Sequence, residues 1–65
     1  MRTTGQLVRE RRVLLGIDQR DLSQISGVSI HTISDIEAGK GNPTVATLSR
    51  ILDALGMELH VRIKE

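Results

Sequence analysis

The residues of this chain that could carry out catalysis lack the spacing that catalytic and metal sites need. Residues 27–31 (GVSIH) begin like the turn that presents a nucleophilic serine, but the closing glycine and the α/β context are missing. Residues 39–41 (GKG) lack the upstream glycine and the following Ser or Thr of a phosphate-binding P-loop. His31 and His60 are far apart and have no cluster of further metal ligands around them. We therefore expect no enzymatic activity, no metal and no cofactor.

Composition limits how so short a chain is stabilised and what it binds. The 65 residues make one domain, and a domain of this size buries only about 60% of the surface that its unfolded chain exposes. Cysteine is absent, so self-association has to replace disulfides as the source of extra stability. Aromatic residues are absent too, which leaves no stacking platform for single-stranded nucleic acid. The net charge of +1 neither requires nor excludes nucleic acid as a partner.

The apolar residues come in short runs. None approaches the roughly 20 residues that span a bilayer, and the first four residues lack the apolar segment of a signal peptide. We expect a cytoplasmic protein whose partners include neither a membrane nor a small-molecule substrate.

Four helices are predicted from capping residues, glycine stops and apolar spacing. The predicted N-caps are Thr3, Asp18, Ser29 and Thr44. The predicted helices lie between Thr3 and Gly16, over residues 19–26, over residues 30–38, and between Thr44 and Gly56. The side chains expected to face the core are Leu7, Val8, Leu15, Leu22, Ile25, Ile33, Ile36, Leu48, Ile51, Leu52 and Leu55. Residues 39–43 hold a dense cluster of helix breakers and predict a loop.

After Gly56 the pattern changes to strict alternation, which predicts a half-buried strand over residues 57–64. Its apolar positions are Met57, Leu59, Val61 and Ile63. A lone strand leaves its backbone groups without hydrogen-bond partners, and the sequence predicts no second strand. The expected partner is the same strand of a second copy, paired antiparallel across a two-fold axis with these four residues at the dimer interface.

The two short helices that meet at residues 27–29 indicate a function. Val28 would fill the angle between the two helices, and the second helix is apolar on one side only. An α-helix fits the major groove of DNA, where side chains near its N-terminus reach base edges. The positive end of the helix dipole also favours phosphate.

Over residues 4–56 the chain resembles the phage-repressor (Xre- or Cro-like) helix-turn-helix family. The matching positions are Val8, Arg9, Arg12, Asp18, Gln19, Leu22, Val28, Ser29, Ile33, Ser34, Ile36, Glu37, Gly39, Lys40, Pro43, Thr44, Leu48 and Leu55. Together with the strand predicted from the alternation, which is taken as a dimerisation element over residues 57–65, the resemblance implies a mainly α fold with a helix-turn-helix domain of four or five helices over residues 1–56. It also implies a homodimer that binds palindromic operator DNA. Repression is the expected outcome, because the chain has no second domain for ligand sensing.

The resemblance also implies roles for individual residues. Gln19, Ser29 and Lys40 would contact DNA phosphates, and Arg12 would form an ion pair with Glu37 between the first and third helices. The positions that would contact bases are Ile30, His31, Thr32, Ser34 and Asp35. Family members often carry Gln, Arg or Asn at such positions, so these residues leave the operator sequence undetermined.

The predicted C-terminal strand narrows the resemblance and leaves alternatives open. A phage-repressor bundle that ends in one strand resembles the HipB-like antitoxins, whose partner is a HipA-like kinase toxin. An alternative is a protein-interaction module, or a coactivator, that docks a partner protein through the third helix. Ile30 and the weak net charge favour that alternative slightly. Salt dependence distinguishes the two, because binding to phosphates weakens steeply with salt.

Overall fold

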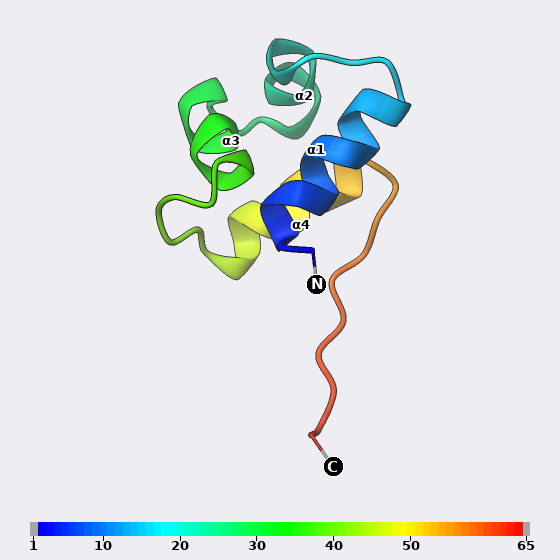
Figure 1. Ribbon diagram of the computed structural model, residues 1–65, viewed down its shortest axis with the longest axis vertical. Helices are drawn as coiled ribbons and strands as arrows, with labels where there is room; N and C mark the ends of the chain where they lie inside the picture. Colours follow the sequence, from blue (N-terminus) through cyan, green and yellow to red (C-terminus); the bar gives the residue numbers. More distant parts are fainter. Residues whose placement is uncertain (1, 65) are drawn as a thin grey trace.

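The computed structural model describes residues 2–64, which fold into four α-helices and an extended C-terminal tail (Figure 1). The helices are α1 (Thr4–Leu14), α2 (Gln19–Ser26), α3 (Ile30–Glu37) and α4 (Val45–Ala54). Residue 1, where the predicted helix-turn-helix domain begins, and residue 65, where the predicted dimerisation strand ends, lie outside the described residues. The mainly helical fold is confirmed, with four helices rather than five among the residues described.

All four helices begin at the predicted N-caps. At α1 the Thr3 hydroxyl accepts a hydrogen bond from the Gln6 N–H (3.1 Å), and the Gln6 side chain accepts one from the Thr3 N–H (2.8 Å). Asp18 and Asp21 make the same reciprocal pair at α2. The hydrogen bond from the Asp21 N–H is the main reason that the pKa of Asp18 lies below its usual value. Local capping chemistry therefore explains where each helix starts.

The core of the described chain combines buried side chains from all four helices and from the turn after α2. They are Val8, Leu22, Val28, Ile33, Ile36, Ile51, Leu52 and Leu55, with Ile17, Leu48, Ala54 and Met57 packed around them. Three other residues predicted to face the core, Leu7, Leu15 and Ile25, are exposed instead, and Ile25 is 62% exposed. Helical spacing marks an apolar edge, but a helix as short as α2 buries only a narrow stripe, and Leu22 occupies it.

Helices α1 and α3 approach each other closely at Gly5. Gly5 is buried in α1, and a Cβ at this position would overlap the main-chain carbonyl oxygen of Ile36 in α3. Only glycine allows α1 to cross α3 at this distance, so this residue sets how closely α3 packs against the rest of the fold.

The predicted C-terminal strand is wrong for the single chain, because residues 57–64 form no strand. They extend away from the helices as a tail (Figure 1). The tail is fixed at its root, where the Met57 N–H donates to the Leu52 carbonyl (2.8 Å) and the Met57 side chain packs on the core. Beyond the root, Val61 is 90% and Ile63 95% exposed. A strand requires a neighbour to share its backbone hydrogen bonds, and the described residues provide none.

Candidate nucleic-acid interface

The turn between α2 and α3 is held by side chains on both sides of it. Gly27 ends α2 in the left-handed conformation (φ +73°), which glycine adopts without strain. The Ser23 hydroxyl donates to the Val28 carbonyl (2.6 Å), and the Ser26 hydroxyl accepts from the Val28 N–H (3.2 Å). The Val28 side chain is buried in the angle between the helices, as predicted. The start of α3 is therefore rigidly placed.

The residues predicted to contact bases all lie on α3, but they are not equally available. Ile30, His31 and Ser34 are exposed. Asp35 is partly buried, and its carboxylate lies 3.3 Å from His31 Nε2, one helical turn away. Thr32 is partly buried too, and its hydroxyl accepts a hydrogen bond from the hydroxyl of Ser29 (2.8 Å). The outward side of α3 thus presents the apolar side chain of Ile30, the hydroxyl of Ser34, and the imidazole of His31 next to the Asp35 carboxylate.

The three residues predicted to contact phosphates have different surroundings. Lys40 is exposed, and its N–H donates to the Asp35 carbonyl (2.8 Å), which fixes the loop against the end of α3. Ser29 is exposed at the N-cap of α3, where its hydroxyl accepts from the Thr32 N–H (3.2 Å). Gln19 is partly buried at the start of α2, and its amide donates to Glu37 (3.3 Å).

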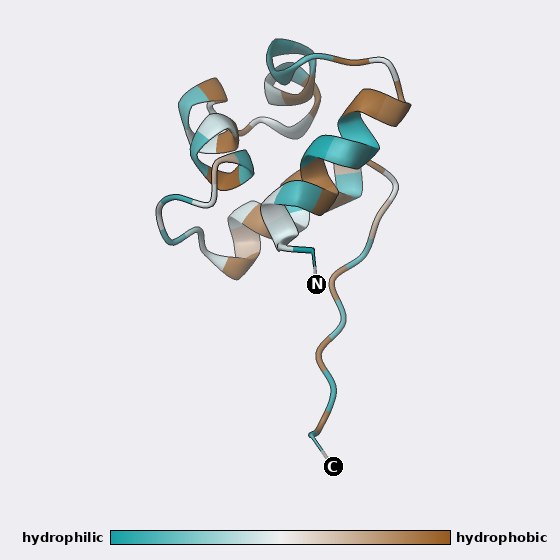
Figure 2. Cartoon of the chain, viewed as in Figure 1, coloured by the Kyte–Doolittle hydropathy of each residue, from teal (hydrophilic) through white to brown (hydrophobic). Residues whose placement is uncertain are grey.

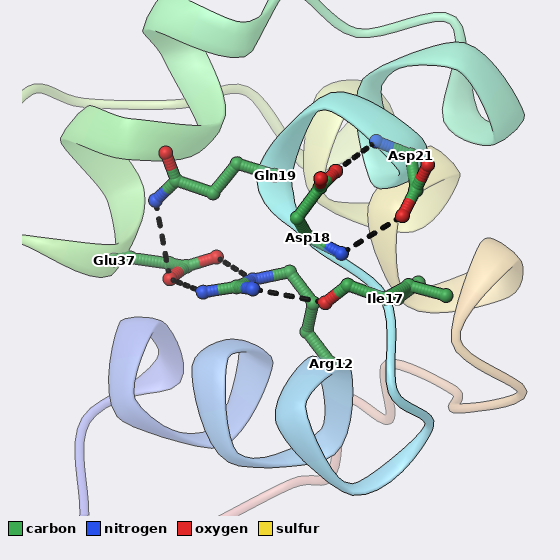
Figure 3. Close-up of polar contacts among 6 residues, drawn as sticks. All are labelled: Arg12, Ile17, Asp18, Gln19, Asp21 and Glu37. Carbon is green, nitrogen blue, oxygen red and sulfur yellow. Dashed lines mark hydrogen bonds and ion pairs between the residues drawn. The ribbon is translucent and has the colours of Figure 1, made fainter.

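Arg12 and Glu37, predicted to pair, form a bidentate ion pair between α1 and the end of α3 (Figure 3). The two bonds measure 2.8 and 3.0 Å, and the side chains are only 12% and 5% exposed. Arg12 also donates to the Ile17 carbonyl (3.0 Å), in the turn before α2. The hydrogen bond to Glu37 is the main reason that the pKa of Arg12 is raised above its usual value. Together with Gln19, the pair joins α1, α2 and α3 through one carboxylate.

Asn42 is a candidate contact residue that the sequence did not single out. A shallow hollow beside α3 is lined by Asn42 together with Thr32, Asp35, Ile36, Lys40, Gly41 and Pro43. The breaker cluster at residues 39–43 predicts a loop here, but breakers carry no information on which loop side chain faces the helix.

Within residues 2–64 there is no cluster of three or more potential metal ligands, and no helix is both long and apolar enough to cross a membrane.

Two short helices joined by a tight turn, the second of them exposed along one side, define the helix-turn-helix class of DNA-binding domains. The chain matches the family profile described as Helix-turn-helix over residues 8–61. It therefore belongs to this Xre-like family of DNA-binding transcriptional regulators, which confirms the resemblance found in the sequence.

Three relatives illustrate the family. An uncharacterised HTH-type transcriptional regulator of Methanothermobacter thermautotrophicus is 41% identical over 52 residues, which cover 80% of this chain and 75% of the relative. The regulator PuuR of Escherichia coli is 34% identical over 55 residues, 85% of this chain but 30% of the relative. The ImmF control region 10 kDa protein of Bacillus phage phi105 is 33% identical over 57 residues, 88% of this chain and 63% of the relative. None of these three names mentions a toxin, and the antitoxin prediction also loses its strand, so the HipA-like partner has no support here.

Proposed function

We propose that this protein is a transcriptional repressor that binds a palindromic operator as a homodimer, with α3 of each copy in the major groove. The observation that carries the proposal is the contrast between the two sides of α3. Ile33 and Ile36 anchor one side in the core, while Ile30, His31 and Ser34 face solvent. A rigidly placed helix with a free side is the element that reads base edges in the major groove.

The base-reading and phosphate-binding roles follow from this placement. In the proposed complex Ile30 would pack on a thymine methyl group, and Asp35 would accept a hydrogen bond from the amino group of cytosine. Lys40 supplies a positive charge beside α3. Gln19 uses one amide proton for Glu37, and its second proton is left for a DNA phosphate. In this arrangement Gln19 links DNA contact to the ion pair that holds α3.

The homodimer follows from the tail. Each tail exposes both edges of its backbone, and antiparallel pairing of two tails would satisfy one edge of each. A two-fold dimer would place its two α3 helices on one face of the DNA, about one helical turn (roughly 34 Å) or a multiple apart. Bound at a promoter, a dimer of this size would act by occupying the DNA.

One observation favours a second candidate, docking of a partner protein through α3. Ile30 is 47% exposed at the N-terminal end of α3, and a protein partner would also bury it. Salt separates the candidates, because only binding to DNA phosphates releases condensed counterions and weakens in proportion to the number of phosphate contacts.

Titration of operator DNA with single variants at several salt concentrations tests the proposal. Lys40→Ala should weaken binding to every sequence and lower the magnitude of the log–log salt slope by about 1. His31→Ala and Asp35→Ala should instead change the preference at one or two base pairs, by about 1–3 kcal/mol each. Arg50→Ala, which removes an exposed positive charge from α4, is the control and should leave both the slope and the preference unchanged. Equal loss in the Lys40, His31 and Asp35 variants, with unchanged base preference, would contradict the placement of α3 in the groove.

A further inference from the structure

Most of the large apolar side chains that are exposed in residues 2–64 belong to α1 or to the tail. On α1 and its C-cap they are Leu7, Val13, Leu14 and Leu15, and in the tail they are Leu59, Val61 and Ile63. The C-terminal end of α1 stands out in Figure 2 as an apolar stretch at the outside of the bundle. Exposed apolar residues that form a contiguous patch indicate an interaction surface.

The α1 residues and the tail are contiguous. Leu7 and Leu14 are seven residues, or two helical turns, apart and so share one side of α1. We call these two residues the α1 outer face. Arg11 lies between Leu7 and Leu14, and its Nε donates to the Leu55 carbonyl (2.9 Å), where α4 ends and the tail begins. The α1 outer face therefore borders the root of the tail.

The tail is complementary to a second copy of itself. Antiparallel pairing about His60 places Leu59 opposite Val61 and Met57 opposite Ile63, so apolar residues meet on one face of the ribbon. On the other face the same register places Glu58 of one copy opposite Arg62 of the other, and the two-fold axis repeats this pair. Opposite charges directly across an antiparallel pair are stabilising. This complementarity specifies a second copy of the chain as the partner.

Paired tails alone are too small for a stable dimer. An isolated two-stranded ribbon is marginal in water, and stable interfaces bury about 1,200–2,000 Å² in total. The apolar side of the ribbon needs a helical surface to cover, and the α1 outer face is the exposed apolar surface next to it. We propose that the α1 outer face and the tail together form one two-fold interface with a second copy of this chain.

This interface leaves α3 accessible. Gly5, which meets α3, and Leu7 are two residues apart, so they point about 200° apart around α1. The α1 outer face is thus turned away from α3, and dimerisation does not compete with the groove contacts. The inference rests on the proposed function only in taking a second copy as the partner, and the dimer can be tested without DNA.

Sedimentation equilibrium of Leu14→Gln tests this interface, with Ile25→Gln as the matched control. Leu14 is 74% and Ile25 62% exposed, each near the C-terminal end of a short helix, so neither change should affect the folded single chain. The dimer Kd should rise at least about tenfold for Leu14→Gln, since burial of a leucine contributes more than a factor of ten. For Ile25→Gln it should stay within about twofold. An unchanged Kd in Leu14→Gln, or a wild-type chain that stays monomeric, would overturn the proposal.

Affinity for a single half-site, measured on the same variants, separates this inference from the proposed function. We expect half-site binding by Leu14→Gln to equal that of the wild type. A Leu14-dependent dimer that fails to bind any DNA would overturn the repressor proposal and leave the interface intact. Weak half-site binding by Leu14→Gln, despite normal half-site binding by the wild type, would show that Leu14 acts on the fold or on α3 and would overturn the interface.

Discussion

Glu37 connects α3 to the two helices packed against it. Its carboxylate accepts two hydrogen bonds from Arg12 and one from Gln19, so one side chain at the end of α3 fixes both neighbouring helices. Both side chains are largely shielded from solvent, with 12% and 5% of their surface exposed. Removal of one partner from such a pair leaves the other charged, desolvated and without compensation.

Glu37→Ala should therefore lower the free energy of unfolding by up to about 3–5 kcal/mol. A domain of this size has only about 5 kcal/mol in total, so thermal or chemical denaturation should find the variant largely unfolded. Glu10→Ala is the control, because it removes an exposed ion pair with Arg2 (3.2 Å) and should cost less than about 1 kcal/mol. Similar melting of Glu37→Ala and the wild type would contradict the structural role of the pair.

At the scale of the helices, Gly5 sets the distance between α1 and α3. Gly5→Ala raises helix propensity by about 1 kcal/mol, but the new methyl group would overlap backbone, which cannot move aside as a flexible side chain can. Overpacking typically costs about 1–3 kcal/mol, so we expect net destabilisation in chemical denaturation. Operator affinity should also fall in the folded fraction, because α3 is displaced. Thr4→Ala, at the exposed neighbouring position, should change stability by less than about 0.5 kcal/mol. A Gly5→Ala variant more stable than the wild type would show that α1 and α3 separate without penalty.

The sequence predicts these helices well because their starts are decided locally. Thr3, Asp18, Ser29 and Thr44 each cap a helix through a bond to a residue three positions ahead, and such spacing is visible in the chain. The burial of Leu7, Leu15 and Ile25 was predicted incorrectly because burial depends on which helices pack together, and helical spacing alone does not specify that. The Gly5 contact was missed for the same reason.

In the candidate site, too, the sequence predicts the features that depend on local pattern and misses those that depend on contacts between helices. The turn around Val28 and the outward position of His31 follow from the pattern of the two short helices. The bond between Gln19 and Glu37 and the position of Asn42 beside α3 depend on contacts between helices, which no local pattern encodes. The tail is the extreme case. Its alternation favours a strand, but whether the strand forms depends on a neighbour outside the chain.

For the whole molecule, the fixed root of the tail determines how two copies would be related. Met57 packs on the core, and Arg11 binds the Leu55 carbonyl, so the start of the tail moves with the helices. In the proposed dimer, insertion of two glycines between Met57 and Glu58 would preserve the alternation of the tail but loosen this connection. The variant should bind the best operator more weakly and tolerate operators with one added or removed central base pair better than the wild type. Binding assays on a set of spacing variants measure this, and two glycines inserted after Lys64 are the control. Equal spacing preference in both insertions would show that the root does not control geometry.

With a rigid root, the proposed dimer would bind only half-sites that lie a fixed distance apart on the DNA. Each added base pair moves one half-site about 3.4 Å along the DNA and rotates it by about one tenth of a turn. A dimer whose two α3 helices are fixed relative to the ribbon meets both half-sites at one separation only. Spacing would then contribute to operator selection at base pairs that no side chain touches, which allows a domain with few base contacts to find its site among many similar sequences.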